Sequence, residues 1–575
     1  MRVGVNLIPL RPGRMGGAEV YFRDLLAELS RRGDHEYVLV TADYNHATLP
    51  ADSTGCRRVP FKHDPVDSDW RGSVAQAALR GSAQAVAALG RAYDLYVPLS
   101  ARPWLKRGFS RLASAAGTLR YLRAERRRQV AETLREIIRR ERIDLWFCPF
   151  TSLDPRVPPV PSLITVFDLQ HEHFPEFFHP DELAHRRRFY PESCAGADHV
   201  ITISEFTRQG VMDHYGVEPR RVTTVWLAPA AGVDWADGRR QIAEVRRRHG
   251  LPSRYAFYPA NTWRHKNHAR LVEALARYRA VHGSTLGLVL TGAPAEGHAA
   301  LESALDTHDL RDAVRVLGYV PRTDLPGLYA GAECLVLPSL FEGFGIPAAE
   351  AMLAGCPVAA ARTTSLPEIV GDAAVLFDPL DPADIARAIA RILHEPGLAQ
   401  TLARRGADRA PRFSIARMAD ETLAVFERVV AQGLAVRQRP GREAVQVEGV
   451  WDDCWMGTEA VVLLVGALES VEVEGEVAGI PLLLPQSVMV EVGGSPAASV
   501  SLPAAGPFSF TVPLDGRGAA GGFQEVRLVP DRTICPRRLG WSDDERDLSL
   551  QVRRLTARTR DGREIVKRLG APAVA

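Results

Sequence analysis

The first part of the chain alternates short, continuous apolar runs with amphipathic segments. The runs have the length and composition of strands buried on both faces, and they lie at 3–8, 144–148, 162–167 and 199–203. A glycine loop follows the first run, and after it Tyr21, Leu25 and Leu29 recur at helical spacing. Gly33 is expected to end that helix. The order strand, helix, strand predicts an open parallel sheet.

The same pattern begins again after Pro229. A strand near 254–260 precedes a polar loop (NTWRHKN) and a helix at 267–280. Further apolar runs continue the pattern at 286–292, 314–320, 333–339 and 357–361. We interpret this as a second doubly wound sheet. Such sheets bind ligands at the carboxyl ends of their strands and, with two domains, in the cleft between them.

The pattern changes near residue 440. Segments such as SVEVEGEV, SVMVEVGG, FSFTVPL and EVRLVP alternate apolar and polar residues between turns, which predicts short strands of a β-sandwich. The predicted fold class is therefore α/β, with two tandem Rossmann-like domains facing across a cleft and a β-sandwich-like domain after them. We place the domains at 1–225, 226–438 and 439–575, and the last helix of the second could cross back to the first.

Composition narrows the function classes. The chain has 575 residues, 46% of them hydrophobic and 24% charged, which is typical of folded globular domains. A formal charge of +2 gives no global basic field, so we expect no nucleic-acid partner. The seven cysteines lack any Cys-x-x-Cys spacing, the start of the chain resembles a first strand rather than a signal peptide, and no apolar run reaches spanning length. We therefore expect a cytoplasmic protein.

Two carboxylates flank a glycine turn in the stretch FEGFGIPAAEAMLAGCPV. Glu342 is predicted on a loop and Glu350 in the first turn of the following helix, so both can face one cleft. Gly343 and Gly345 would let a ligand approach the helix N-terminus, and carboxylates accept hydrogen bonds from vicinal hydroxyls. This favours a sugar or ribose site. The competing interpretation is a solvated Glu342 and a Glu350 that only balances the helix dipole.

A lysine marks a second loop at the same predicted sheet edge. Lys266 and Asn267 precede a helix, a place where lysine commonly meets phosphate, although a single loop lysine is more often merely solvated. A phosphate site beside a polyol site describes a nucleotide sugar.

At this point the residues resemble a known family. The run 314–379 resembles the donor half of retaining glycosyltransferases of the GT-B fold, family 4, and Glu342 and Glu350 match its Glu-x7-Glu signature. The segments SLPE, GDAA, VITISEFTRQGV and YPANTWRHKNH are similar too. The resemblance covers roughly residues 1–435 and does not extend to the β domain. It implies that the first domain binds the acceptor and the second the nucleotide sugar.

The resemblance also implies roles for individual residues. Glu342, Asp168 and Lys266 would be the catalytic residues, with Lys266 on the donor diphosphate and Glu342 on the transferred sugar. Glu350 would bind the ribose hydroxyls. The whole donor-binding set would be Gly16, Gly17, Arg264, Lys266, Gly318, Tyr319, Val320, Glu342, Gly343, Phe344, Gly345 and Glu350. No metal and no cofactor is expected; the nucleoside diphosphate sugar is a co-substrate.

The sequence departs from the family pattern in two places. Phe167 stands where the family commonly has a histidine before Asp168, and His171 or His173 could replace that sugar contact. The arginine that often precedes the phosphate lysine would be Arg264. A metal site built on His171 and His173 is disfavoured because no further ligand is near in sequence.

We therefore expect a retaining transferase that moves a hexose to a lipid-linked or polysaccharide acceptor, with mannose from GDP-mannose as the first hypothesis by family analogy. The alternatives are a UDP-glucose or UDP-N-acetylglucosamine donor, and a non-catalytic carbohydrate-binding protein on the same scaffold. A phosphorylase or epimerase fits the glycine turn less well.

Two further features each have two interpretations. Residues 101–142 hold twelve Arg and one Lys against four Glu, so they could contact anionic lipid at the inner membrane face, or form a solvated helix face. In the β domain, Trp451, Trp455 and Trp541 could stack on sugar rings or belong to the core.

Overall fold

A computed structural model describes residues 1–49, 55–61, 130–155, 158–437, 444–450, 455–465, 468–480, 483–492, 495–514, 523–532, 548–559 and 564–569. Most of the basic segment, residues 101–129, lies outside this part of the chain, as do Trp451 and Trp541. None of the described helices is both long enough and apolar enough to cross a membrane.

The first domain is built on a parallel sheet with the strand order β3-β2-β1-β4-β5-β6-β7. Its strands are β1 (Arg2–Asn6), β2 (Glu36–Thr41), β3 (Cys56–Pro60), β4 (Leu145–Cys148), β5 (Ser162–Val166), β6 (His199–Thr202) and β7 (Val222–Thr224). Its helices are α1 (Gly17–Arg32), α2 (Asp43–His46), α5 (Gln170–His173), α6 (Pro180–Gly196) and α7 (Glu205–Tyr215). Helix α1 ends where Gly33 takes a left-handed φ of 76°, as its position predicted.

The second domain repeats this plan with the order β10-β9-β8-β11-β12-β13. Its strands are β8 (Tyr255–Pro259), β9 (Gly287–Thr291), β10 (Val314–Val316), β11 (Cys334–Leu337), β12 (Val358–Ala361) and β13 (Ala374–Phe377). Its helices are α8 (Gly238–His249), α9 (His268–His282), α10 (His298–Thr307), α11 (Leu325–Ala330), α12 (Ile346–Leu353), α13 (Leu366–Val370), α14 (Pro382–His394) and α15 (Leu398–Arg409). The prediction of two parallel sheets in tandem is confirmed.

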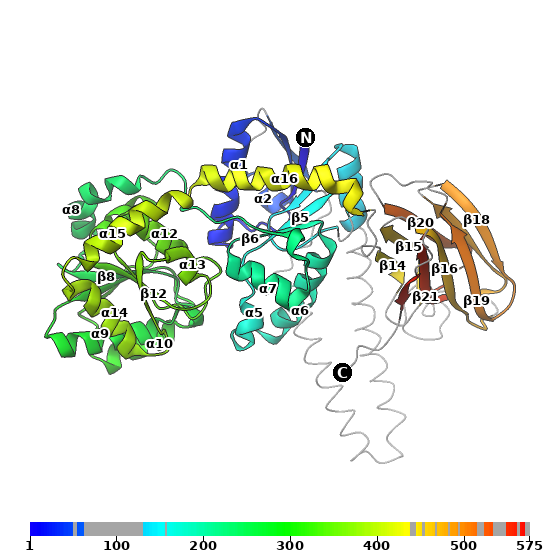
Figure 1. The fold of residues 1–575 in the computed structure, drawn as a ribbon. Coiled ribbons are helices and arrows are strands. Elements are labelled where there is room, and N and C mark those ends of the chain that lie inside the picture. Colours follow the sequence, from blue (N-terminus) through cyan, green and yellow to red (C-terminus); the bar gives the residue numbers. More distant parts are fainter. Residues whose placement is uncertain are drawn as a thin grey trace, which may run out of the picture.

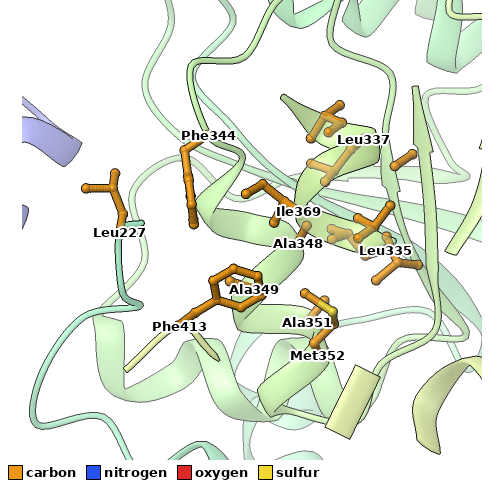
Figure 2. Close-up of a cluster of buried hydrophobic side chains, with 14 of the residues drawn as sticks. Leu227, Leu335, Leu337, Phe344, Ala348, Ala349, Ala351, Met352, Ile369 and Phe413 are labelled. Atoms are coloured by element: carbon orange, nitrogen blue, oxygen red, sulfur yellow. The ribbon is translucent and has the colours of Figure 1, made fainter. Parts of the chain in front are cut away.

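Helix α12 is held in the core of the second domain by its apolar face. Ala348, Ala349 and Met352 are buried against β11, α13 and Phe413, and Figure 2 shows this cluster closing around the helix. Small alanine side chains let the helix lie close to the sheet, so its first turn, and the glycine turn before it, are fixed by packing rather than by local propensity.

The last helix of the α/β region crosses back to the first domain. Helix α16 (Ile415–Arg437) runs in Figure 1 from the second domain along α1. The Arg32 guanidinium donates to the carbonyl oxygen of Ala416 at 2.8 Å and pairs with Asp420. Farther along, Phe426 packs edge-on against Phe147 of β4, with ring centroids 5.2 Å apart.

The C-terminal domain consists of two antiparallel sheets with the orders β14-β15-β20-β17-β18 and β19-β16-β21-β22. Its strands are β14 (Ala444–Val450), β15 (Met456–Val465), β16 (Leu468–Val477), β17 (Gln486–Val492), β18 (Ser495–Leu502), β19 (Gly506–Pro513), β20 (Phe523–Pro530), β21 (Gln551–Thr559) and β22 (Glu564–Arg568). The domain has its own valine- and leucine-rich core, which confirms the predicted extra β domain. Trp455 is partly buried and packs against Leu483 and Leu548, which form a small apolar cluster beside the main core.

Candidate active site

The candidate site lies where the strand order of the second sheet reverses. Strands β8 and β11 are neighbours at the middle of that sheet, with Leu335 paired to Phe257. The chain that leaves β8 carries Lys266, and the chain that leaves β11 carries Glu342. Parallel strands that diverge at such a switch point leave a crevice at their carboxyl ends, which is where doubly wound sheets bind ligands.

Lys266 and Glu342 form an ion pair at this point. The Lys266 Nζ atom lies 2.7 Å from Glu342 Oε1, and the Ser339 hydroxyl donates to the same oxygen at 2.6 Å. The Lys266 side chain is 19% exposed and the Glu342 side chain 10%, so the ion pair is largely shielded from water. The two residues that we predicted on separate loops therefore meet in one site.

The loop that bears Lys266 is fixed by Asn267. The Asn267 side-chain amide donates to the carbonyl oxygens of Pro338 at 3.0 Å and Pro379 at 2.8 Å, which ties the end of the lysine loop to the ends of β11 and β13. The backbone of Asn267 is left-handed, with φ 61°, a conformation that asparagine tolerates better than most residues. The position of Lys266 thus follows from buried hydrogen bonds and not from its own flexible side chain.

The environment keeps Glu342 ionised. Burial alone would raise the pKa of Glu342, but the charge and hydrogen bond of Lys266 and the hydroxyl of Ser339 lower it below its usual value. Neighbouring His265 is largely buried, and burial lowers its pKa to about 4, so it adds no charge at neutral pH. The site therefore presents one fixed cation and one fixed carboxylate.

Three consecutive hydroxyl residues hold the glycine turn from its other side. Thr363 Oγ1 donates to the carbonyl oxygen of Ser339 at 3.1 Å, and Thr364 Oγ1 accepts from the Glu342 amide at 3.0 Å. The buried Ser365 hydroxyl lies 2.9 Å from the carbonyl oxygens of both Glu342 and Phe344. Thr364 does this with φ 51°, which is a strained value for a β-branched residue. Such strain is typical of functional sites.

Glu350 lies deeper than the sequence suggested. Helix α12 begins at Ile346, so Glu350 is in its second turn, and our placement in the first turn was wrong. The carboxylate is buried and accepts a hydrogen bond from the Tyr329 hydroxyl at 2.6 Å. Burial raises the pKa of Glu350, and the Tyr329 hydroxyl and the charge of Arg322 oppose that rise only in part. A ligand hydroxyl would be a second donor to this carboxylate.

The remaining predicted donor residues surround the same sheet edge. Gly318, with φ 66°, accepts a hydrogen bond from the Gly292 amide at 2.7 Å, and Tyr319 is 82% exposed beside the buried Val320. Arg264 lies in a 3-10 turn (Arg264–Lys266), and its guanidinium is 5.1 Å above the Phe177 ring of the first domain. Arg264 is thus an exposed cation in the same turn as Lys266, and Tyr319 is an exposed aromatic side chain after β10.

In the first domain the structure places Gly16 and Gly17 at the start of α1, with open space around each. Asp168 follows β5 and its carboxylate accepts from the Gln170 amide at 3.0 Å. Phe167 packs edge-on against Tyr21, with ring centroids 5.5 Å apart, which is the contact of a packing residue and not of a polar sugar ligand.

The two histidines near Asp168 have different environments. His171 is fully buried, with Nε2 3.1 Å from the Tyr215 hydroxyl, and burial lowers its pKa to about 4. It is therefore not available to replace the missing sugar contact. His173 is exposed, and burial of part of its ring and the nearby His214 lower its pKa. Among the described residues, no group of three or more His, Cys, Asp or Glu side chains could hold a metal ion.

Two family models match the α/β region of the chain. "Glycosyltransferase Family 4" matches residues 75–228 and "Glycosyl transferases group 1" matches residues 241–409. Among solved structures, a sucrose-phosphate synthase from Thermosynechococcus elongatus has a TM-score of 0.52 at 19% identity, covering 75% of this chain and 99% of its own. A glycosyltransferase from Rickettsia africae has a TM-score of 0.52 at 12% identity, covering 75% of this chain and 98% of its own. These likenesses concern the fold alone.

The curated relatives match shorter stretches. The O-antigen chain mannosyltransferase B of Escherichia coli is 28% identical over 266 residues, which are 46% of this chain and 70% of the relative. The MMP alpha-(1->4)-mannosyltransferase of Mycolicibacterium hassiacum is 30% identical over a stretch that is 40% of this chain and 54% of the relative. A D-inositol 3-phosphate glycosyltransferase of Salinispora arenicola is 33% identical over a stretch that is 41% of this chain and 56% of the relative. The chain thus spans about half the length of these last two relatives. The two family models together cover more than half of the chain, which therefore belongs to the family 4-like glycosyltransferases of the GT-B fold and carries an additional C-terminal β domain.

Proposed function

We propose that the protein is a retaining hexosyltransferase that uses a nucleoside diphosphate sugar, with GDP-mannose as the first candidate donor, and a polysaccharide or lipid-linked glycan as acceptor. The observation that carries the proposal is the buried Lys266–Glu342 pair at the switch point of the second sheet. A cation for a diphosphate and a carboxylate for sugar hydroxyls stand side by side there. The names of two relatives, both mannosyltransferases, favour mannose over other hexoses.

The proposed reaction needs few protein groups. The bond between the anomeric carbon and the diphosphate oxygen breaks, a bond to the acceptor oxygen forms on the same face, and the acceptor proton passes to the leaving phosphate. Lys266 would stabilise the negative charge that develops on that phosphate. Stabilisation of this kind is usually the largest single contribution to an enzyme's rate enhancement. Glu342 would orient the sugar, and Glu350 would accept hydrogen bonds from the ribose.

A panel of nucleotide sugars tests the proposal. GDP-mannose, UDP-glucose, UDP-N-acetylglucosamine and UDP-galactose are compared by thermal shift and by slow hydrolysis of the donor. We expect GDP-mannose to stabilise the protein most. A ligand at 100 times its Kd adds about 2.7 kcal/mol to the free energy of unfolding, so binding should appear as a higher melting temperature. Release of free mannose from GDP-mannose should accompany the shift.

Variants show whether binding uses the candidate site. Lys266→Ala and Glu350→Ala should abolish the shift, whereas Glu395→Ala removes an exposed carboxylate on the far end of α14 and should leave it unchanged. A larger shift with a UDP-sugar would replace the mannose hypothesis. If none of the four compounds binds, the protein is not a transferase of these donors, and a non-catalytic carbohydrate-binding role becomes the better explanation.

We also propose that residues 101–142 contact anionic membrane, since an enzyme with a lipid-linked acceptor works at a lipid surface. The support is composition alone: twelve Arg and one Lys against four Glu. The protein should sediment with vesicles rich in anionic lipid at low salt, and salt at about 0.5 M should release it, because screening weakens such contacts. Failure to sediment at low salt would refute the contact.

A further inference from the structure

The residue immediately before Glu342 is an aromatic side chain that leaves its own domain. Phe341 is only 2% exposed, although it lies at the start of the glycine turn. Its ring contacts three rings of the first domain: His173 at 5.3 Å, Phe206 at 5.9 Å and Phe174 at 6.2 Å between centroids. We call these three residues the socket. Phe341 is thus buried by the opposite domain.

Hydrogen bonds also join the two domains beside the socket. The Glu368 carboxylate, on α13 of the second domain, accepts from the backbone amides of Glu205 at 2.9 Å and Phe206 at 3.2 Å. It also accepts from the Trp226 indole at 2.7 Å. These amides are the free donors at the start of α7, where a carboxylate is favoured by the helix dipole. The same helix that supplies Phe206 is therefore held by the second domain.

The glycine turn itself touches the first domain. A Cβ atom at Gly343 would lie 2.4 Å from the carbonyl oxygen of Phe167 and 3.1 Å from Asp168 Cβ. Phe341 and Gly343, on either side of Glu342, are thus both seated against the first domain. Glu342 is thus held by Lys266 and Ser339 of its own domain, while the residues on either side of it rest against the first domain.

We infer that Phe341 is a positioning residue, and that Glu342 takes up its working position only when Phe341 is seated in the socket of His173, Phe174 and Phe206. The inference rests on the proposed function, because the position that matters is that of Glu342 toward a transferred sugar. Its physical basis is simple. When the domains separate, Phe341 and the socket lose their shared burial, and the turn loses its outer support. Contact between the two domains and correct placement of the Glu342 carboxylate then occur together.

The inference separates nucleotide binding from turnover. Lys266, Glu350 and the Tyr319 edge all belong to the second domain, so they can hold the nucleotide whether or not the socket is filled. Loss of Phe341 should therefore leave nucleotide affinity nearly intact and lower kcat. A purely structural role would lower both, together with the melting temperature.

A double-mutant cycle across the domains tests this. Phe341→Ala and Phe206→Ala should each lower kcat for donor hydrolysis or transfer by about 10- to 100-fold, since a misplacement of about 1 Å has such effects. The double variant should be no slower than the slower single variant, because the contact can be lost only once. Affinity for GDP and UDP should stay within about threefold. Phe341→Leu, which keeps apolar volume, should recover kcat to within about fivefold of the native value.

The control is Phe189→Ala, which removes a first-domain aromatic that stacks on His185 and lies outside the socket; it should leave kcat unchanged. Effects of the two single variants that multiply, or a parallel loss of nucleotide affinity and kcat, would overturn the inference.

A measurement without catalysis keeps this test apart from the test of the proposed function. Small-angle X-ray scattering should show a larger radius of gyration for Phe341→Ala and for Phe206→Ala, with no further increase in the double variant. If the native protein turns over none of the nucleotide sugars, the proposed function fails and the scattering result alone decides on the socket. Unchanged radii in all three variants would overturn it.

Discussion

Replacing Lys266 with methionine should lower turnover by about a thousandfold, since loss of a single group that stabilises developing negative charge costs about that much. The structure adds a second consequence. Methionine keeps most of the apolar stem but leaves the buried Glu342 carboxylate without its cation. Removal of one partner of a buried pair typically lowers the free energy of unfolding by about 3–5 kcal/mol. The ~1000-fold loss of rate should therefore come with a clear loss of stability.

The loss of stability should depend on pH in a defined direction. In the native protein the pKa of Glu342 lies below its ordinary value of 4.5, so its stabilising contribution is present above that value and is lost as the pH falls through the folded pKa. Without Lys266, burial is opposed by the Ser339 hydroxyl and by the charge of His265 when that ring is protonated, and we expect the pKa of Glu342 to rise above 4.5. The variant then loses stability as the pH rises. The difference in the free energy of unfolding between the native protein and the variant should be small near pH 4.5 and should increase toward pH 8.

Urea unfolding of Lys266→Met at several pH values checks this expectation. The double variant Lys266→Met, Glu342→Gln should regain much of the stability and lose its pH dependence, yet stay inactive. Lys567→Met, at an exposed position of β22, is the matched control and should change neither property. A stability gap that does not change between pH 4.5 and 8 would show that Glu342 is not the charge that Lys266 compensates.

Adding one methyl group at Gly343 should lower turnover by about 100-fold, because the alanine Cβ would stand where the two domains meet. That atom would lie 2.4 Å from the Phe167 carbonyl oxygen, closer than van der Waals contact allows. The cause is not backbone strain, since Gly343 is not among the glycines with positive φ. Alanine is acceptable to the turn itself, and only the approach of the first domain is blocked.

Steady-state kinetics and calorimetric titration of nucleotide check the Gly343→Ala variant. We expect kcat to fall while nucleotide affinity stays near the native value, since Lys266 and Glu350 are untouched. Gly479→Ala, where the nearest atom to a new Cβ is 3.8 Å away, is the control and should behave as the native protein does. Native turnover in Gly343→Ala would mean that the two domains need not meet at this turn for reaction.

Much of the fold could be predicted because buried parallel strands leave a strong local signal. The apolar runs at 333–339 and 357–361 predicted the bounds of β11 and β12 to within two residues at each end. The alternating segments after residue 440 gave the β domain in the same way. Glu350 was assigned to the first turn of α12, whereas it is the fifth residue of that helix and lies just beyond the first turn.

The candidate site was predictable only where residues lie within a recognisable turn. Glu342 and Lys266 were found from their places after strands, and neighbouring strands then bring them to 2.7 Å. The partners Ser339, Tyr329 and Thr364 were missed, because a hydroxyl gives no sequence signal until its acceptor is known. The run of three hydroxyl residues at 363–365, whose serine begins the segment SLPE, was the one available sign. Phe341 was missed because an apolar residue beside a strand looks like local core.

The chain passes between the α/β domains twice, and this limits how they can move. The first passage follows β7, where the Ala231 amide donates to Asp24 of α1 at 3.0 Å, and the second leads into α16, which Arg32 of α1 binds at its start. Two covalent connections side by side permit rotation about one shared axis and resist twisting about others. Because α16 stays with α1, the β domain that follows it in the chain should move with the first domain, while the second domain moves relative to both.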